Sequence, residues 1–265
     1  MKYGLPAVSI LPVRAEPSER SEMVTQMLFG EVCEVLEVIG RWMRVSLKPD
    51  HYEGWVRAAL VVPLDEDPDR KNDVWITDRI MEVEEHTTGG IWLLPPGSRI
   101  RGVNRSTGLF DHGSYRFRIK GQLPGTPEPA IPTVVTLARR FLGAPYLWGG
   151  KTPFGTDCSG LVQVVFSIIG IDLPRDAGKQ VDTGKNVGFV QEALPGDLAF
   201  FENERGLISH VGIISEKGKI IHASGMVRED ILDTEGIYDP ATKSYTHRLR
   251  TIKSVLENSS IGITQ

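Results

Sequence analysis

Short runs of alternating apolar and polar residues dominate the start of the chain. The pattern predicts strands over residues 7–13, 31–38, 42–47 and 54–56, with glycine, proline and charged residues between them. Strands this short, separated by turn residues, are typical of a small β-barrel and not of helices. An all-β domain is therefore predicted for residues 1–63.

A similar pattern returns after an acidic, proline-containing stretch over 63–73, which is predicted to be a linker. The segments WITDRIMEVEE, IWLLPPGSRIRGV and SYRFRIK are again strand-like, so a second small barrel is predicted for residues 74–122. The stretch GQLPGTPEPAIP has four prolines in twelve residues and marks a second domain boundary.

The periodicity changes after this boundary. Apolar residues at helical spacing predict a helix over 134–142, with Thr133 as its N-cap, and a second, more apolar helix over 159–169. Strands are predicted farther along the chain, over 196–201, 208–215 and 219–223. Helices followed by a run of strands indicate an α+β domain over residues 131–265.

Composition adds limits to this picture. With 265 residues, 40% of them apolar, the chain has material for two or three domains. Lysine and arginine are outnumbered by acids and the net charge is −4, which argues against a nucleic acid partner. No run approaches the roughly 18 apolar residues of a membrane span. The first ten residues lack the apolar stretch of a secretory signal, so a cytoplasmic protein is predicted, with a signal peptide already removed as the open alternative.

The two cysteines, Cys33 and Cys158, lie in different segments and form no disulfide framework. Cys33 is predicted to pack as a small apolar strand residue. Cys158 directly precedes the predicted helix over 159–169, where unpaired main-chain N–H groups and the helix dipole favour an anion. A thiol at that position is expected to have a lowered pKa, which makes Cys158 the candidate nucleophile.

Two of the six histidines interrupt apolar strands, namely His210 and His222. The other four are predicted to be surface or loop residues: His51, His86, His112 and His247. A three-residue hairpin loop over 216–218 pairs Ser215 with Lys219 and Gly212 with His222, which places both strand histidines on one face. A two-residue loop would place them on opposite faces. The first geometry predicts a Cys–His–His relay.

Five sequence blocks carry a family resemblance. In order, YLWGG, GTDCSGLVQVVF, GDLAFF, HVGI and IIHASG resemble the NlpC/P60 family of papain-like cysteine peptidases, and the N-terminal segment VRAEPSERSE to EGWV resembles a bacterial SH3 domain. The resemblance implies an α+β papain-like catalytic domain preceded by two all-β SH3-like barrels. It also implies that Cys158 is the nucleophile, that His210 is the general base and acid, and that His222 orients His210. No metal or cofactor is called for.

The domain order is most similar to the γ-D-glutamyl-L-diamino acid endopeptidases of this family, also called dipeptidyl-peptidase VI. That similarity implies hydrolysis, through a thioester, of the bond between γ-D-glutamate and a diamino acid in free muropeptides with an N-terminal L-alanine. It further implies a place in the recycling of cell-wall peptides. The main-chain N–H of Cys158, aided by the Tyr146 hydroxyl, is the implied oxyanion hole.

The charges of such a ligand suggest its protein contacts, since an ammonium requires a carboxylate and a carboxylate requires donors. Asp157 and Ser159 flank the nucleophile, and the matching positions in similar enzymes contact the ligand; helix capping is the alternative for both. Arg175 and Asp176 match another family block. Ala177 departs from that block, because related enzymes often have serine there, which puts the detail of carboxylate binding in doubt.

The first barrel is also expected to reach the substrate. In similar enzymes an acid and a tyrosine of this domain close one end of the cleft, and Glu22 and Tyr52 are the matching candidates here; exposed barrel residues are the alternative. Two other functions remain open: a peptidoglycan hydrolase or amidase of the same fold, secreted or wall-associated, and a non-catalytic wall-binding module. The choice between diaminopimelate and lysine after the scissile bond is also open.

Overall fold

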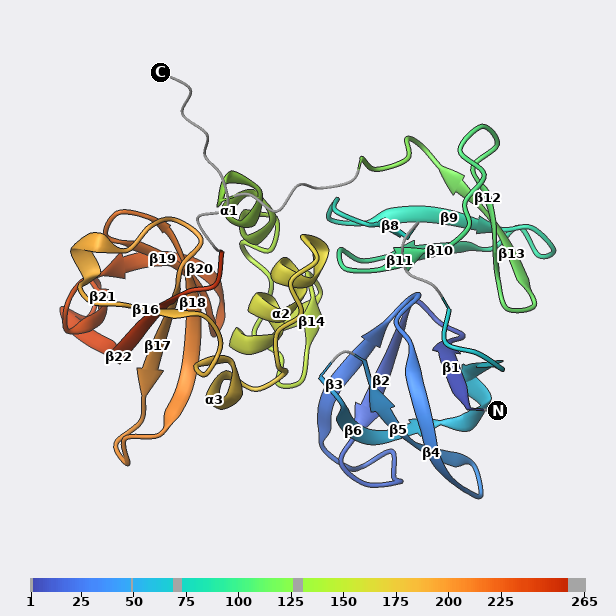
Figure 1. The fold of residues 1–265 in the computed structure, drawn as a ribbon, viewed down its shortest axis with the longest axis horizontal. Helices are drawn as coiled ribbons and strands as arrows, with labels where there is room; N and C mark the ends of the chain where they lie inside the picture. The colour runs from blue at the N-terminus through green and yellow to red at the C-terminus, as the bar shows by residue number, and fades with distance from the viewer. Residues whose placement is uncertain (1, 49, 69–72, 126–130, 257–265) are drawn as a thin grey trace.

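The computed structural model describes residues 2–48, 50–68, 73–125 and 131–256. Figure 1 shows three parts along the chain: a blue β-barrel, a cyan to green β-sheet region, and a larger part from α1 onward. The last nine residues of the predicted third domain, 257–265, lie outside the described residues, as do parts of both predicted linkers, 69–72 and 126–130. Within the described residues, no helix has the length and apolar character needed to cross a membrane.

The first part is a seven-stranded sheet with the order β3-β2-β6-β5-β4-β1-β7. Its strands are β1 Tyr3–Pro6, β2 Ile10–Arg14, β3 Met23–Leu28, β4 Cys33–Ile39, β5 Trp42–Leu47, β6 Tyr52–Arg57 and β7 Val61–Leu64. Cys33 is fully buried in the core of this sheet, as predicted, and burial raises the pKa of its thiol to about 12. The sequence pattern missed β3, because four of its six residues are buried and it does not alternate.

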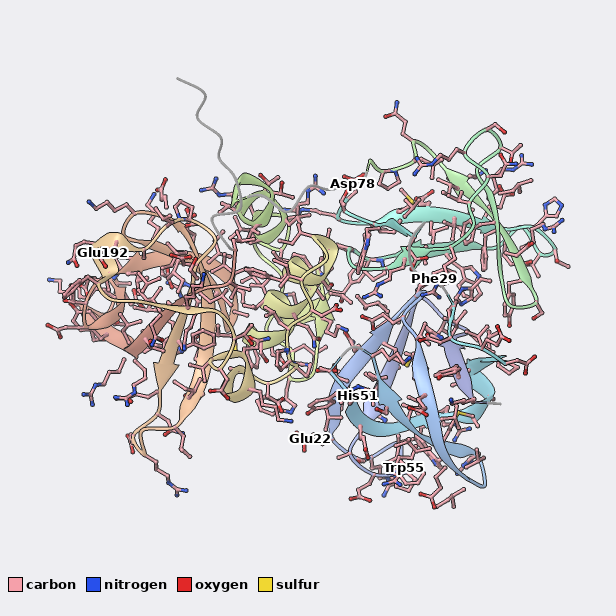
Figure 2. The ribbon with its side chains drawn as sticks, viewed as in Figure 1. Glu22, Phe29, His51, Trp55, Asp78 and Glu192 are labelled. Atoms are coloured by element: carbon pink, nitrogen blue, oxygen red, sulfur yellow. The ribbon has the colours of Figure 1, made fainter. Side chains whose placement is uncertain are left out.

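The second part is also all-β, with a four-stranded sheet β10-β9-β13-β12 and a separate pair β11-β8. Its strands are β8 Val74–Trp75, β9 Met81–Glu85, β10 Ile91–Leu94, β11 Arg99–Ile100, β12 Leu109–His112 and β13 Tyr115–Lys120. Phe29 enters its core from the first part, as Figure 2 shows at the top of the blue barrel. His112, predicted to lie on the surface, is instead buried and stacks on Phe29 at 3.9 Å, because the two β parts share this core.

The third part packs helices against a curved sheet. The helices are α1 Ile131–Arg139, α2 Cys158–Ile168 and α3 Ala177–Gln180, with a short ribbon β14 Lys151–Thr152 and β15 Gly155–Thr156. The sheet strands are β16 Lys185–Val187, β17 Leu198–Glu202, β18 Ile208–Glu216, β19 Lys219–Ser224, β20 Met226–Leu232, β21 Gly236–Asp239 and β22 Ser244–Ser254. Pairing of β21 with β22 closes β17 to β22 into a barrel, and α2 packs on its outside. The helix predicted over 159–169 is α2; α1 begins before Thr133, so Thr133 is not its N-cap.

The hairpin between β18 and β19 pairs Gly212 with His222, as predicted, but its turn differs from the predicted one. The turn is shorter than expected, because Glu216 pairs with Lys219, and the predicted pairing of Ser215 with Lys219 is wrong. A register shift between Ile214 and Glu216 leaves Ser215 as an extra residue. This bulge restores the register that the two-residue turn would otherwise shift by one position.

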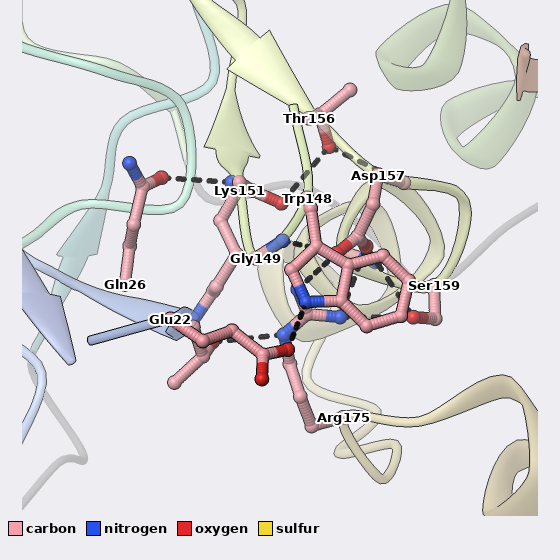
Figure 3. A network of polar contacts seen from close by, with 12 residues as sticks. Glu22, Gln26, Trp148, Gly149, Lys151, Thr156, Asp157, Ser159 and Arg175 are labelled. Carbon is pink, nitrogen blue, oxygen red and sulfur yellow. Dashed lines mark hydrogen bonds and ion pairs between the residues drawn. The ribbon is translucent and has the colours of Figure 1, made fainter. Parts of the chain in front are cut away.

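Polar contacts join the first barrel to the third part (Figure 3). Lys151 bonds Glu31 at 2.9 Å, and its main-chain N–H donates to Gln26 at 2.8 Å. Gly149 packs against the main chain of β3, where an added Cβ would stand 2.3 Å from the Met23 carbonyl oxygen. Its φ of +77° also lies in the left-handed region, so only glycine suits this close approach.

Candidate active site

Cys158 is the first residue of α2, which begins one residue earlier than predicted, and its side chain is almost wholly buried. Asp157 is the N-cap, and its carboxylate accepts a hydrogen bond from the Gly160 N–H at 2.7 Å. The buried, apolar length of α2 anchors this helix against the barrel, so the position of Cys158 follows from packing. Beside it lies a cavity of about 340 Å³.

The ionisation of Cys158 differs from the expectation. Burial, and next the nearby Asp157 carboxylate, raise the pKa of the thiol to about 11, although main-chain hydrogen bonds from Val211 and Ser159 act in the other direction. The helix terminus therefore does not make a thiolate by itself, because desolvation of a charge outweighs it. A base must remove the proton during the reaction.

Two histidines and an aspartate form a hydrogen-bonded chain near the thiol. His210 Nε2 lies 2.8 Å from His222 Nδ1, and His222 Nε2 lies 3.0 Å from an oxygen of Asp230, which Arg228 also contacts. The Nδ1 atom of His210 remains for the thiol side. No hydrogen bond joins the Cys158 thiol to the His210 ring within residues 131–256, and such bonds often tighten only when substrate binds.

His247, predicted to lie on the surface, is half-buried and stacks on the His210 ring at 4.1 Å with 27° between the planes. Burial, and next the neighbouring His222, lower the pKa of His247 to about 4. Burial, followed by His247 and His222, lowers the pKa of His210 well below 6.5. Both rings are therefore uncharged at neutral pH and can accept a proton.

Ring nitrogens of His210, His222 and His247 come within 4.8 Å of one another, the only such cluster of potential metal ligands among the described residues. A metal ion lies in the ring plane of each histidine that binds it. The stacked rings of His210 and His247 do not direct their nitrogens at a common point, and His222 is already bonded to His210. The arrangement suits a proton relay better than a metal site.

Arg175 organises a buried network around the nucleophile (Figure 3). Its guanidinium donates to the two oxygens of Asp157 at 3.0 and 2.5 Å and to the Ser159 hydroxyl at 2.9 Å, while Nε donates to Thr25 of the first barrel at 2.8 Å. The Gly149 N–H donates to Asp157 as well. Helix capping, the alternative considered for both Asp157 and Ser159, holds for Asp157 only, because Ser159 lies inside α2. Ligand contact by Asp157, Ser159 and Arg175 stays a prediction.

The first barrel supplies part of the cavity wall. Glu22 accepts a hydrogen bond from the Trp148 indole at 2.5 Å, and Figure 2 labels Glu22 on the edge of the barrel nearest the third part. Burial, and next the Asp176 carboxylate, raise the pKa of Tyr52 to about 12. Burial and then Cys158 raise the pKa of Tyr146 to about 12 as well, which places this phenol beside the thiol. The cavity lining includes every predicted site residue except the two histidines: Glu22, Tyr52, Tyr146, Asp157, Cys158, Ser159, Arg175 and Asp176.

Comparisons with known proteins agree with this geometry. The sequence model of the NlpC/P60 family matches residues 143–251, and that of the bacterial dipeptidyl-peptidase SH3 domain matches residues 13–59. A γ-D-glutamyl-L-lysine dipeptidyl-peptidase of Bacillus subtilis is 32% identical over 237 residues, which cover 81% of this chain and 77% of that protein. The chain belongs to the NlpC/P60 family. It is a cysteine peptidase whose papain-like domain follows an all-β N-terminal region.

Two further relatives extend the comparison. A γ-D-glutamyl-L-lysine dipeptidyl-peptidase of Bacillus cereus is 25% identical over 236 residues, covering 77% of this chain and 68% of that one. The crystal structure of an NlpC/P60 family protein from Bacillus cereus matches with a TM-score of 0.82 over 96% of this chain and 99% of that chain, at 20% identity. The match shows that the NlpC/P60 fold is shared across nearly the full length.

Sequence reasoning missed three residues of this NlpC/P60 site: Trp148, Asp230 and His247. Asp230 had a usable signal, because the hairpin that pairs Ile220 with Asp230 places it on the same face as His222. His247 had none, since a bulged ladder joins β22 to β17 and β21 and brings it to His210 from 37 residues away. Trp148 contacts Glu22 only because the first barrel packs beside it.

Proposed function

We propose that this protein is an endopeptidase that hydrolyses the bond between γ-D-glutamate and a diamino acid in small peptides with a free N-terminal L-alanine. The observation that carries the proposal is that Glu22 and Trp148, hydrogen-bonded to each other, line the cavity beside Cys158. A carboxylate that lines a cavity favours a ligand that carries an ammonium. The names of the Bacillus subtilis and Bacillus cereus relatives support a γ-D-glutamyl substrate.

The chemistry divides among the residues as follows. His210 takes the proton of the Cys158 thiol as sulfur attacks the γ-carbonyl carbon, and His222 with Asp230 stabilises the resulting imidazolium. The main-chain N–H of Cys158 and the Tyr146 hydroxyl donate to the oxyanion. His210 then protonates the departing amine, which leaves a thioester on Cys158. Water, activated by the same ring, attacks the thioester and regenerates the thiol.

The size and charge of the cavity limit the acyl part of the substrate. Its volume of about 340 Å³ lies at the small end of ligand cavities, which run from roughly 300 to 1,000 Å³. Glu22, with Tyr52 and Asp176 beside it, would hold the alanine ammonium, and Asp157, Ser159 and Arg175 would contact the rest of the dipeptide. A substrate this small points to free peptides, and so to a cytoplasmic place in the recycling of cell-wall peptides.

Hydrolysis of L-Ala-γ-D-Glu-L-Lys beside its N-acetylated form tests the proposal, with the diaminopimelate peptide in parallel. The expected result is release of L-Ala-D-Glu from the free-amine peptides only, and no release by Cys158→Ala. Glu22→Gln should raise KM for the free-amine peptide by about tenfold, since it removes one charge-assisted contact. Equal cleavage of free and acetylated peptides would overturn the claimed gating and favour a hydrolase of intact wall, and inactivity on every peptide would favour a binding module.

A further inference from the structure

A second cavity, of about 840 Å³, borders the one beside Cys158. It lies at one end of the barrel formed by β17 to β22, and the charged residues of its lining are Arg248 and three acids, Glu202, Glu204 and Glu235. Ser209 lines both cavities, and His247, which stacks on His210, lines only the second. We propose that this groove binds the diamino acid that leaves as the amine product, and that Arg248 binds its carboxylate. This inference rests on the proposed function and deepens it.

The direction of the substrate follows from the position of the general acid. The departing nitrogen must lie within hydrogen-bond reach of the group that protonates it, so the leaving group lies next to the His210 ring. Glu22 and Trp148 line the acyl cavity, and the proposed function assigns the ammonium end of the substrate to that side, so the leaving group lies on the other side of the scissile bond. Beyond His210 the next open space is the groove that His247 and Ser209 line.

Arg248 is placed to receive an anion there. Its side chain lines the groove and is 81% exposed, while its Nε lies 3.4 Å from a carboxylate oxygen of Glu202, a side chain only 9% exposed. One contact of this length leaves most of the five N–H donors of a guanidinium for a ligand. A diamino acid at the C-terminus of a tripeptide carries a free α-carboxylate. A guanidinium binds such a group in a bidentate manner.

Arg250 provides a matched control on the same strand. Its Nε lies 3.5 Å from the other oxygen of Glu202, and its side chain is 63% exposed, so it resembles Arg248 in charge, partner and exposure. Arg250 lines a different cavity, together with Gly188, Phe189 and Thr251. Replacing either arginine removes one charge and one contact to Glu202, but only the Arg248 change removes a side chain that lines the groove.

The test compares L-Ala-γ-D-Glu-L-Lys with the same peptide ending in a carboxamide, for wild type, Arg248→Ala and Arg250→Ala. We expect wild type and Arg250→Ala to prefer the free acid by about three- to tenfold in kcat/KM, mainly through KM, and Arg248→Ala to lose this preference. The ratio of the two peptides cancels any general damage to folding.

Two results would overturn the inference while leaving the proposed function intact: an Arg248→Ala enzyme that keeps the wild-type preference, or an Arg250→Ala enzyme that loses it equally. Failure of the proposed function itself looks different, because wild type would then cleave neither peptide. The diaminopimelate tripeptide and its amide, measured alongside, should follow the lysine pair, since both leaving groups carry the same α-carboxylate.

Discussion

Replacing Arg175 by methionine should be among the most destabilising single changes in the third part. The guanidinium is 3% exposed and pairs with Asp157, whose side chain is 7% exposed. Methionine keeps much of the side-chain length but removes the charge, so the Asp157 carboxylate stays buried without its counterion. Breaking a buried pair in this way costs about 3–5 kcal/mol in the free energy of unfolding.

The structure narrows that range. Asp157 keeps the N–H groups of Gly149 and Gly160 as donors after the change, which moves the expected cost toward about 3 kcal/mol. Arg139 gives a matched comparison, because it pairs with Glu229 at 3.3 Å with side chains 48% and 26% exposed. Arg139→Met should therefore cost about 1 kcal/mol or less.

Urea unfolding followed by tryptophan fluorescence measures both variants, with the midpoint compared at constant slope. The double variant Asp157→Asn, Arg175→Met should lose less than the sum of the single losses, because neither charge is then left alone. An Arg175→Met loss no larger than that of Arg139→Met would refute the reasoning. It would mean that the protein or water compensates the buried carboxylate without Arg175.

Three further outcomes are expected. Asp230→Asn should lower kcat about tenfold or more with little change in KM, because it weakens the contact that orients His222. Peptide hydrolysis measures both constants, and a change in KM alone would argue against a proton relay through His222. His247→Ala should raise the pKa of His210, because burial and, once His247 is protonated, repulsion from that ring both hold it low. The value of kcat/KM should therefore begin to fall at a higher pH on acidification. His247→Phe keeps an aromatic ring stacked on His210 and should shift the acidic side of the kcat/KM profile less. Unchanged pH profiles for both variants would contradict an effect of His247 on the pKa of His210. Gly149→Ala should lower the free energy of unfolding, measured with urea, by at least about 2 kcal/mol. Gly143→Ala, at φ +84° with open space around the added Cβ, should lower it by about 1 kcal/mol. Equal losses would mean that backbone strain is the only cause, without a contribution from the close contact at Gly149.

The buried thiol has a consequence for how the enzyme works. With the pKa of Cys158 at about 11 and that of His210 below its usual value, the free protein holds a neutral thiol beside a neutral imidazole. In the proposed mechanism, proton transfer accompanies attack on the substrate, and the His222 and Asp230 contacts would stabilise the imidazolium.

Local pattern was enough for the elements that carry the predicted triad. The apolar run after Cys158 predicts α2, and the alternation around His210 and His222 predicts β18 and β19, because burial of one face imposes a period on the sequence. The same reasoning placed the all-β region at the N-terminus. The strands β20, β21 and β22 were not predicted, since their mixed polar faces lie partly exposed.

Contacts between segments far apart in the chain were beyond the reach of pattern. His247 meets His210 only after the barrel of the third part has closed, and Trp148 meets Glu22, and Arg175 meets Thr25, only after the first barrel has packed on the third part. The pKa of Cys158 belongs to the same class, because desolvation depends on everything that covers the thiol. Sequence alone thus predicted the candidate catalytic residues and located the elements that carry them, because their spacing is local. Packing determined their ionisation, their supporting contacts and the lining of the cavity, which depend on distance in space.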